Sequence, residues 1–312
     1  MSLDVIIPSY NEEDNIEPLY KELTKTLSNY RYTLIFIDDG SKDKTLANLI
    51  KIYKKDQEHV KVISFARNFG KDAAIYAGMK ESTAKYVTII DSDLQQDPKL
   101  IIDMIDFLEE NDDYDEVAMV NRYENESKIS RFFKKSFYKT MKKLTKYDFH
   151  DGASDFRTMR NYVVKAITAL QENNRFTKGL FAWVGFNVKY MDYNPNKRNA
   201  GKSKFNFRKQ LSYALDGVMN FSTSPIKFAL YLGTIIASGS FVYLIYLIIK
   251  TLVKGKDSPG FASIMCVMLL LGGIILIVQG MIGEYVAKTY IESKNRPIYV
   301  TKTKLGFDED IL

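Results

Sequence analysis

The chain has 312 residues, of which 46% are hydrophobic, with a formal net charge of +6 and a mean hydropathy of −0.20. This length suffices for one large domain or two modest ones. Two histidines and one cysteine disfavour His-based triads and zinc centres and exclude an internal disulfide. The first residues, MSLDVIIPSYNEED, hold no basic stretch and no long apolar run, so no signal peptide is expected.

Residues 3–121 alternate apolar runs with segments of helical spacing. Strands are predicted at Asp4–Ile7, Thr33–Ile37, Val60–Ser64, Tyr86–Ile90 and Glu116–Asn121. Helices are predicted between them, at Glu13–Ser28, Lys44–Lys54, Asp72–Ser82 and Lys99–Glu109. This alternation predicts an α/β fold with a mostly parallel, doubly wound sheet, which binds ligands at the carboxyl ends of its strands. The polar clusters PSYNEE, DDGSKD, ARNFGKD and DSDLQQD all fall at those ends, where we expect the site.

Acidic residues follow two of the predicted strands. Asp91 and Asp93 can share one divalent cation, and Mg²⁺ favours a few carboxylates plus substrate phosphates; a solvated acidic turn is the alternative. Asp38 and Asp39 can accept hydrogen bonds from a nucleoside or cap the next helix. Because neither G-x-G-x-x-G nor G-x-x-x-x-G-K-[ST] is present, a nucleotide would be held by carboxylates, a metal and basic residues. Asp97 is interpreted as the cap of the following helix.

A basic amphipathic segment lies in the middle of the chain. Residues 128–146, KISRFFKKSFYKTMKKLTK, combine an apolar helical face with eight basic residues. This pattern is typical of a helix on an anionic membrane surface. An ordinary surface helix and a nucleic-acid-binding face are the alternatives. A second interfacial helix is predicted at Lys204–Ser222.

Two uncharged runs follow, at Phe228–Ile249 and Ser258–Gly283. Each reaches the ~20 residues needed to cross a bilayer, so two transmembrane helices are predicted. Lysine and arginine are more numerous on the outer flanks than in the connection, which holds Lys250, Lys254 and Lys256. The positive-inside rule therefore predicts cytoplasmic termini. The predicted organisation is a cytoplasmic domain (1–202), an interfacial helix (203–225), a transmembrane hairpin (226–283) and a cytoplasmic tail (284–312).

Several motifs together resemble a known family. PSYNEEDNI, IDDGSKDKT, RNFGKDAAIYAG and DSDLQQDP look like the nucleotide-sugar domain of family 2 glycosyltransferases with the GT-A fold. SDFRTMRNYVV, RFTKGLFAWVGF, RNAGKSKFNFRK and GEYVAKTYIESKNRPIY resemble the branch that acts on polyisoprenyl phosphates, which includes bacterial undecaprenyl-phosphate glycosyltransferases and dolichol-phosphate mannose and glucose synthases. The resemblance covers nearly the whole chain.

The resemblance implies an activity. A hexose would pass with inversion from a nucleotide sugar, UDP-linked by analogy with the bacterial members, to undecaprenyl phosphate at the cytoplasmic face of the membrane. The product would be a lipid-linked sugar donor for the cell envelope. Mg²⁺ or Mn²⁺ would be the cofactor, and a homotetramer the assembly. Which sugar is transferred cannot be read from the residues.

The resemblance also implies roles for individual residues. Those placed at the donor are Pro8, Tyr10, Glu12, Asp39, Lys71 and Asp91. Those placed at the metal are Asp91, Asp93 and Gln95. Those placed at the donor or acceptor phosphates and the membrane surface are Arg122, Arg131, Lys134, Lys135, Arg198, Lys202 and Lys204. Asp155 matches an acidic residue with a base or sugar-positioning role, and Thr158 replaces the leucine of many relatives.

Two other functions were weighed against this one. Processive family 2 polysaccharide synthases carry a Q-x-x-R-W motif and usually more spans, whereas Trp183 stands in LFAWVG, outside that context. A non-catalytic membrane scaffold with a transferase-like domain would be expected to lose its acidic pairs. Both pairs, Asp38–Asp39 and Asp91/Asp93, are present.

Overall fold

The computed structural model describes residues 2–121, 150, 152–173, 175–196, 224–254 and 260–308. The chain divides into two compact units, described separately below. One comprises Met1–Ala214 together with Arg296–Leu312, and the other comprises Leu215–Asn295. The predicted interfacial helices at 128–146 and Lys204–Ser222 lie outside the described residues.

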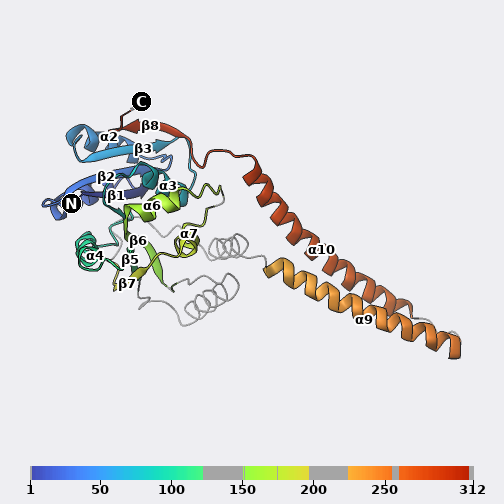
Figure 1. The fold of residues 1–312 in the computed structure, drawn as a ribbon. Helices are drawn as coiled ribbons and strands as arrows, with labels where there is room; N and C mark the ends of the chain where they lie inside the picture. Colours follow the sequence, from blue (N-terminus) through green and yellow to red (C-terminus); the bar gives the residue numbers. More distant parts are fainter. Residues whose placement is uncertain are drawn as a thin grey trace. The chain divides into compact units, whose positions relative to one another are not determined.

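The first unit is built on an eight-stranded sheet in the order β7-β5-β6-β4-β1-β2-β3-β8 (Figure 1). Strands β1 to β4 pair in parallel, as do β5 and β7, whereas β6 runs antiparallel to both of its neighbours and β8 runs antiparallel to β3. The predicted mostly parallel α/β sheet is confirmed. The strands are β1 (Ser2–Ser9), β2 (Arg31–Asp38), β3 (Val60–Phe65), β4 (Tyr86–Ile89), β5 (Glu116–Asn121), β6 (Ala153–Arg160), β7 (Val188–Tyr193) and β8 (Thr301–Leu305).

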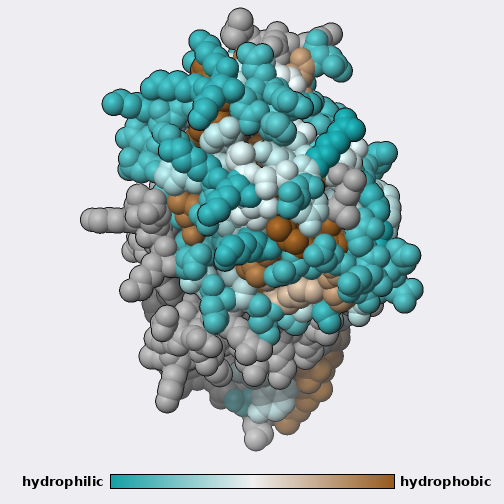
Figure 2. Space-filling view, turned by 90° about the vertical axis from the view of Figure 1, so that its left-hand side faces the viewer, coloured by the Kyte–Doolittle hydropathy of each residue, from teal (hydrophilic) through white to brown (hydrophobic). Residues whose placement is uncertain are grey.

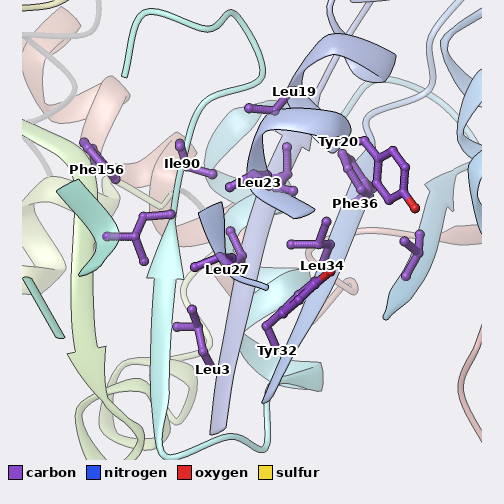
Figure 3. Close-up of a cluster of buried hydrophobic side chains, with 14 of the residues drawn as sticks. Leu3, Leu19, Tyr20, Leu23, Leu27, Tyr32, Leu34, Phe36, Ile90 and Phe156 are labelled. Carbon is purple, nitrogen blue, oxygen red and sulfur yellow. The ribbon is translucent and has the colours of Figure 1, made fainter. Parts of the chain in front are cut away.

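Helices cover both faces of this sheet, because alternate residues of the buried strands point to opposite faces. In β1, Val5 and Ile7 belong to one hydrophobic cluster and Ile6 to the other. The first cluster includes the apolar stripe of α1, which lies over the strands in Figure 3. It also includes residues of α2 and α4, and the second cluster includes residues of α3 and α6. The helices are α1 (Ile16–Thr26), α2 (Thr45–Lys55), α3 (Lys71–Glu81), α4 (Lys99–Glu110), α6 (Asn161–Thr168) and α7 (Thr177–Val184).

Helix α3 lies unusually close to the sheet. Its residues Ala73–Met79 are all buried, and a Cβ atom at Gly78 would lie 2.4 Å from Cγ2 of Ile6. A glycine is therefore required where the helix crosses β1. This close packing fixes the position of Lys71, the first residue of the helix.

The second unit contains α9 (Ser224–Lys254) and α10 (Phe261–Ser293). Both helices are long and apolar enough to cross a membrane, with mean hydropathies of 1.4 over Ile226–Tyr243 and 1.8 over Leu270–Ser293. Most of their described large apolar side chains are exposed. By contrast, the face of the molecule in Figure 2 is largely hydrophilic, with its hydrophobic residues in small groups.

Candidate functional site

The loops after β1 and β2 are joined by hydrogen bonds at the carboxyl edge of the sheet. The amide of Asn11 donates to Oγ of Ser41 (3.0 Å), and the amide of Lys42 donates to Oδ1 of Asn11 (2.9 Å). Asn11 has a φ of 52°, a left-handed conformation that asparagine tolerates better than most residues. The structure thus brings the predicted clusters PSYNEE and DDGSKD together.

Asp39 organises the loop that precedes Lys71. Its carboxylate accepts hydrogen bonds from the side chain of Asn68 (2.8 Å) and from the amides of Phe69 (2.6 Å) and Gly70 (3.0 Å). Burial raises the pKa of this carboxyl group, and the hydrogen bonds from the two amides partly offset that effect. The contact with a nucleoside that the resemblance implies for Asp39 stays a prediction.

The neighbouring Asp38 also accepts hydrogen bonds from nearby residues. Its carboxylate accepts from the amide of Ser41 (3.1 Å) and from the hydroxyl of Ser64 (2.7 Å). The N-cap residue of α2 is Lys44, without a side-chain cap bond. The helix-cap interpretation of the Asp38–Asp39 pair is therefore wrong.

Lys71 bridges two carboxylates from different strands. Its Nζ lies 2.6 Å from Oδ1 of Asp91, just after β4, and 2.8 Å from Oδ2 of Asp155 in β6. Burial disfavours the ammonium charge, but the two carboxylates outweigh burial and hold the pKa of Lys71 well above its usual range. The lysine side chain remains 44% exposed, so its cation can still meet a ligand.

The loop after β4 orients Asp91 through Gln96. The side-chain oxygen of Gln96 accepts from the amide of Asp91 (2.8 Å), and its nitrogen donates to Oδ2 of the same residue (3.1 Å). Leu94 in this loop has a φ of 60°, which is uncommon for a residue other than glycine and is found more often at functional sites. Gln96 was missed in the sequence because the D-x-D-x-Q pattern points to Gln95.

The carboxylates of Asp91 and Asp93 are the candidate ligands of a metal ion. Oδ1 of Asp93 accepts from the amide of Gln95 (3.2 Å), whereas the side-chain nitrogen of Gln95 lies 3.5 Å from the carbonyl oxygen of Asn196. Among the described residues, no group of three His, Cys, Asp or Glu side chains is arranged for a metal ion. Two carboxylates nevertheless suit Mg²⁺, which often takes its other ligands from substrate phosphates and water. Gln95 as a metal ligand stays a prediction.

Asp155 is a poor base in this environment. Burial opposes its ionisation, but the positive charges of Lys71 and Lys178 outweigh burial and hold its pKa well below the usual range. The Nζ of Lys178 donates to the carbonyl of Ala153 (3.2 Å), which places this lysine beside the same strand. The sequence analysis missed Lys178, because RFTKG marks neither a strand end nor an acidic partner.

A buried ion pair lies next to Asp155 in β6. Nη1 of Arg157 is 3.2 Å from Oε1 of Glu116, and these side chains are 5% and 2% exposed. The guanidinium also stacks over the ring of Phe181, 3.6 Å from its centroid. Thr158 packs its hydroxyl 2.7 Å from that of Thr88, so the residue that departs from the family pattern pairs with β4 inside the sheet.

Tyr193, at the end of β7, is a further residue that the sequence analysis missed. Burial raises the pKa of its phenol, and the charges of Asp91 and then Asp93 act in the same direction. The side chains of Ser154 and Gln96 act in the opposite direction and lower the pKa of the phenol. Tyr193 thus lies at the same acidic centre, although it comes from a strand that the sequence analysis did not predict.

The other predicted residues fall into two groups. Pro8 is buried in β1, Tyr10 follows that strand, and Oε2 of Glu12 accepts from Asn15 (2.7 Å). Oδ1 of Asp97 accepts from the amide of Lys99 (2.9 Å) at the start of α4, but the N-cap residue of this helix is Pro98, without a side-chain cap bond, so the predicted cap role of Asp97 is not confirmed. The residues that lie outside the described part of the chain are Arg122, Arg131, Lys134, Lys135, Arg198, Lys202 and Lys204.

Comparison with known proteins identifies the family. The model of glycosyl transferase family 2 matches residues 4–168, which contain Lys71, Asp91 and Asp155. The chain belongs to glycosyltransferase family 2. An uncharacterized glycosyltransferase of Synechocystis is 40% identical over 311 residues, 99% of this chain and 97% of that protein. The bactoprenol glucosyl transferase of Shigella phage SfV is 36% identical over 306 residues, 97% of this chain and 99% of that protein.

The chain is also similar to solved structures. Glucosyl-3-phosphoglycerate synthase from Mycobacterium tuberculosis, in complex with Mn²⁺ and uridine-diphosphate-glucose, has a TM-score of 0.46 and 16% identity, covering 70% of this chain and 77% of that one. The chain is a glycosyltransferase, and the predicted GT-A-type α/β fold is confirmed.

Proposed function

We propose that this glycosyltransferase moves a glucose residue from UDP-glucose to a polyprenyl phosphate at the cytoplasmic face of a membrane. The observation that supports the chemistry is the bridge from Lys71 to Asp91 and Asp155, which gathers a cation and two carboxylates at the carboxyl edge of the sheet. Several relatives that match nearly the whole chain are named bactoprenol glucosyl transferases, which supports both the sugar and the acceptor.

The donor diphosphate needs positive charge as its bond to the sugar breaks. Lys71 can contribute that charge, because its ammonium stays protonated and partly exposed. Asp91 and Asp93 would hold a divalent cation, which two carboxylates suit. Such an ion supplies charge neutralisation of the leaving diphosphate. Electrostatic stabilisation of this kind is usually the largest contribution to catalysis.

The acceptor needs little help from a base. A phosphate monoester has a second pKa of about 6, so at pH 7 it is largely dianionic and already nucleophilic. One of its oxygens attacks the anomeric carbon in line with the departing diphosphate, and the configuration inverts. Asp155, whose pKa is held low by the nearby lysines, orients the sugar or the acceptor and removes no proton.

Strand β8 supports the proposed topology. It follows α10 in the chain, yet it pairs with β3 in the same sheet as the N-terminal strand. If α9 and α10 both cross the bilayer, the chain returns to its original side, as this pairing requires. The excess of basic residues on the outer flanks then favours the cytoplasmic side.

A donor panel tests the proposed function. The full chain in lipid vesicles is given undecaprenyl phosphate with UDP-glucose, UDP-N-acetylglucosamine, UDP-galactose or GDP-mannose, with Mg²⁺, Mn²⁺ or EDTA. We expect UDP-glucose to give the highest yield of glycosylated lipid by mass spectrometry, and EDTA to abolish it. A long polysaccharide without lipid linkage would favour the processive synthase. Absence of both nucleotide binding and turnover would favour the scaffold.

A further inference from the structure

The segment that follows α10 packs against the loop that leads to Lys71. The ring of Tyr299 stacks on that of Phe65, with centroids 4.8 Å apart and planes inclined by 21°. Phe65 in turn meets Phe69 edge to face at 5.8 Å. The carbonyl of Val300 accepts from the amide of Ala66 (2.9 Å). The rings of Tyr299, Phe65 and Phe69 thus form a series of contacts that ends two residues before Lys71.

The same segment also contacts the helix that Lys71 begins. The ring of Tyr299 lies edge-on to that of Tyr76 at 6.3 Å, and Nζ of Lys304 is 3.1 Å from Oε2 of Glu81. Both partners belong to α3. Burial, reinforced by the charge of Glu81, raises the pKa of Tyr299 to about 12, so its hydroxyl is neutral at working pH. The segment therefore touches the elements on both sides of Lys71.

Covering the edge of the sheet does not explain these ring contacts. Backbone pairing between β8 and β3 already satisfies that edge, and Lys302 on β8 is an exposed charge of the kind that discourages further strand addition. Tyr299 precedes β8 and lies where the β3 register is irregular, between Ser64 and Phe65. Its ring stacks on Phe65, the last residue of β3 before the loop, and also meets Tyr76 in α3.

We infer that residues 298–305 complete the donor site, with Tyr299 acting as the positioning residue for Lys71. The inference rests on the proposed function, in which Lys71 meets the donor diphosphate. The family model ends at residue 168, so this contribution comes from the opposite end of the chain. The side chain of Lys71 is held by Asp91 and Asp155. Tyr299 supports the elements on either side of Lys71 through its ring contacts with Phe65 and Tyr76.

Tyr299→Ala and Tyr299→Phe test this role, with Phe307→Ala as the matched control. Phe307 follows β8 and packs under Lys61 and Lys304, so its truncation removes an aromatic ring from the same segment away from the loop. We expect Tyr299→Ala to weaken UDP binding, measured by calorimetry on the full chain in detergent, about tenfold. Tyr299→Phe keeps the stacked ring and should restore wild-type affinity. Phe307→Ala should stay within about threefold of it.

A double-mutant cycle distinguishes positioning from general stability. If Tyr299 acts through Lys71, Tyr299→Ala will lower UDP affinity no further in a Lys71→Ala background. An equal loss in both backgrounds, or an equal loss from Phe307→Ala, would overturn this inference and leave the proposed function standing. A wild-type chain that binds no UDP and glycosylates no lipid would overturn both.

Discussion

Asp155 and Lys71 lie 2.8 Å apart, and each favours the charged form of the other. Because the folded pKa of Asp155 is depressed, its contribution to stability is present above its ordinary value of about 3.9 and is lost only as the pH falls through the folded value. Asp155 therefore stays ionised at every pH between about 5 and 8, a range above both values. No change in activity in that window should come from its titration.

Asp155→Asn separates a positioning role from a base role. We expect kcat to fall about 10- to 100-fold from lost orientation. The rise of kcat/KM with pH near about 6 should remain, because it belongs to the acceptor phosphate. The measurement is the pH profile of both proteins with undecaprenyl phosphate. Loss of that rise in the variant would make Asp155 the base, and unchanged kcat with unchanged donor binding would remove both roles.

Gly70 holds the backbone that leads into Lys71. Its φ of 100° and ψ of 158° lie in a region that glycine adopts and side-chain-bearing residues avoid, at a cost of about 1–3 kcal/mol. A Cβ atom here would meet no atom within 4 Å, so the cost is conformational alone. Gly70→Ala should therefore lower the melting temperature and the UDP affinity together.

Gly239→Ala in α9 is the control for Gly70→Ala. A Cβ atom there also meets nothing within 4 Å, but the residue is helical. Thermal unfolding in detergent should show no loss of stability for this variant. Equal losses for the two variants would contradict the backbone argument.

At the scale of the elements, the Arg157–Glu116 pair joins β6 to β5 inside the sheet. Removal of one partner leaves a buried charge uncompensated, which costs about 3–5 kcal/mol. We expect Glu116→Ala to lower the unfolding free energy by that amount. The exposed pair of Lys85 and Glu109, at 2.6 Å, is the comparison, because Lys85→Met should cost no more than about 1 kcal/mol. Similar losses in chemical denaturation would contradict the assignment.

The sequence predicted the elements whose residues follow a simple rule. Strands β1 to β5 are rich in apolar residues, and each was predicted at nearly its observed place. Strand β6, ASDFRTMR, was missed because it places Arg157 and Thr158 inside the sheet, where each is satisfied by a partner far away in the chain. Strand β8, TKTKL, was missed because its two lysines and two threonines make it look like a polar C-terminal tail.

The site was predictable to the same degree. Asp91 and Lys71 were predicted as site residues because they belong to the local motifs DSDLQQDP and RNFGKDAAIYAG. Lys178 and Tyr193 act on residues of other elements, whereas Gln96 contacts Asp91 within the loop after β4. No periodicity in the sequence reports such contacts. Asp39 was assigned to a ligand because its main partners, the amides of residues 69–70, leave no trace in the sequence.

At the scale of the whole molecule, the pairing of β8 with β3 requires both ends of the chain to lie on one side of any membrane that α9 and α10 cross. A C-terminal fluorescent-protein fusion should therefore fluoresce in bacterial cells, and a C-terminal alkaline phosphatase fusion should be inactive. Phosphatase placed in the 255–259 connection should be active. The reverse pattern would contradict the cytoplasmic assignment, and ends on opposite sides would contradict the two-span hairpin.

In the proposed function, the centre formed by Lys71, Asp91 and Asp155 transfers glucose to a lipid phosphate. The most direct measurement gives the full chain and its Asp91→Asn variant UDP-glucose and undecaprenyl phosphate in vesicles with Mg²⁺, and analyses the extracted lipid by mass spectrometry. We expect glucosyl undecaprenyl phosphate from the wild type and at most a trace from the variant. Equal product from both proteins, or none from the wild type with any nucleotide sugar, would contradict it.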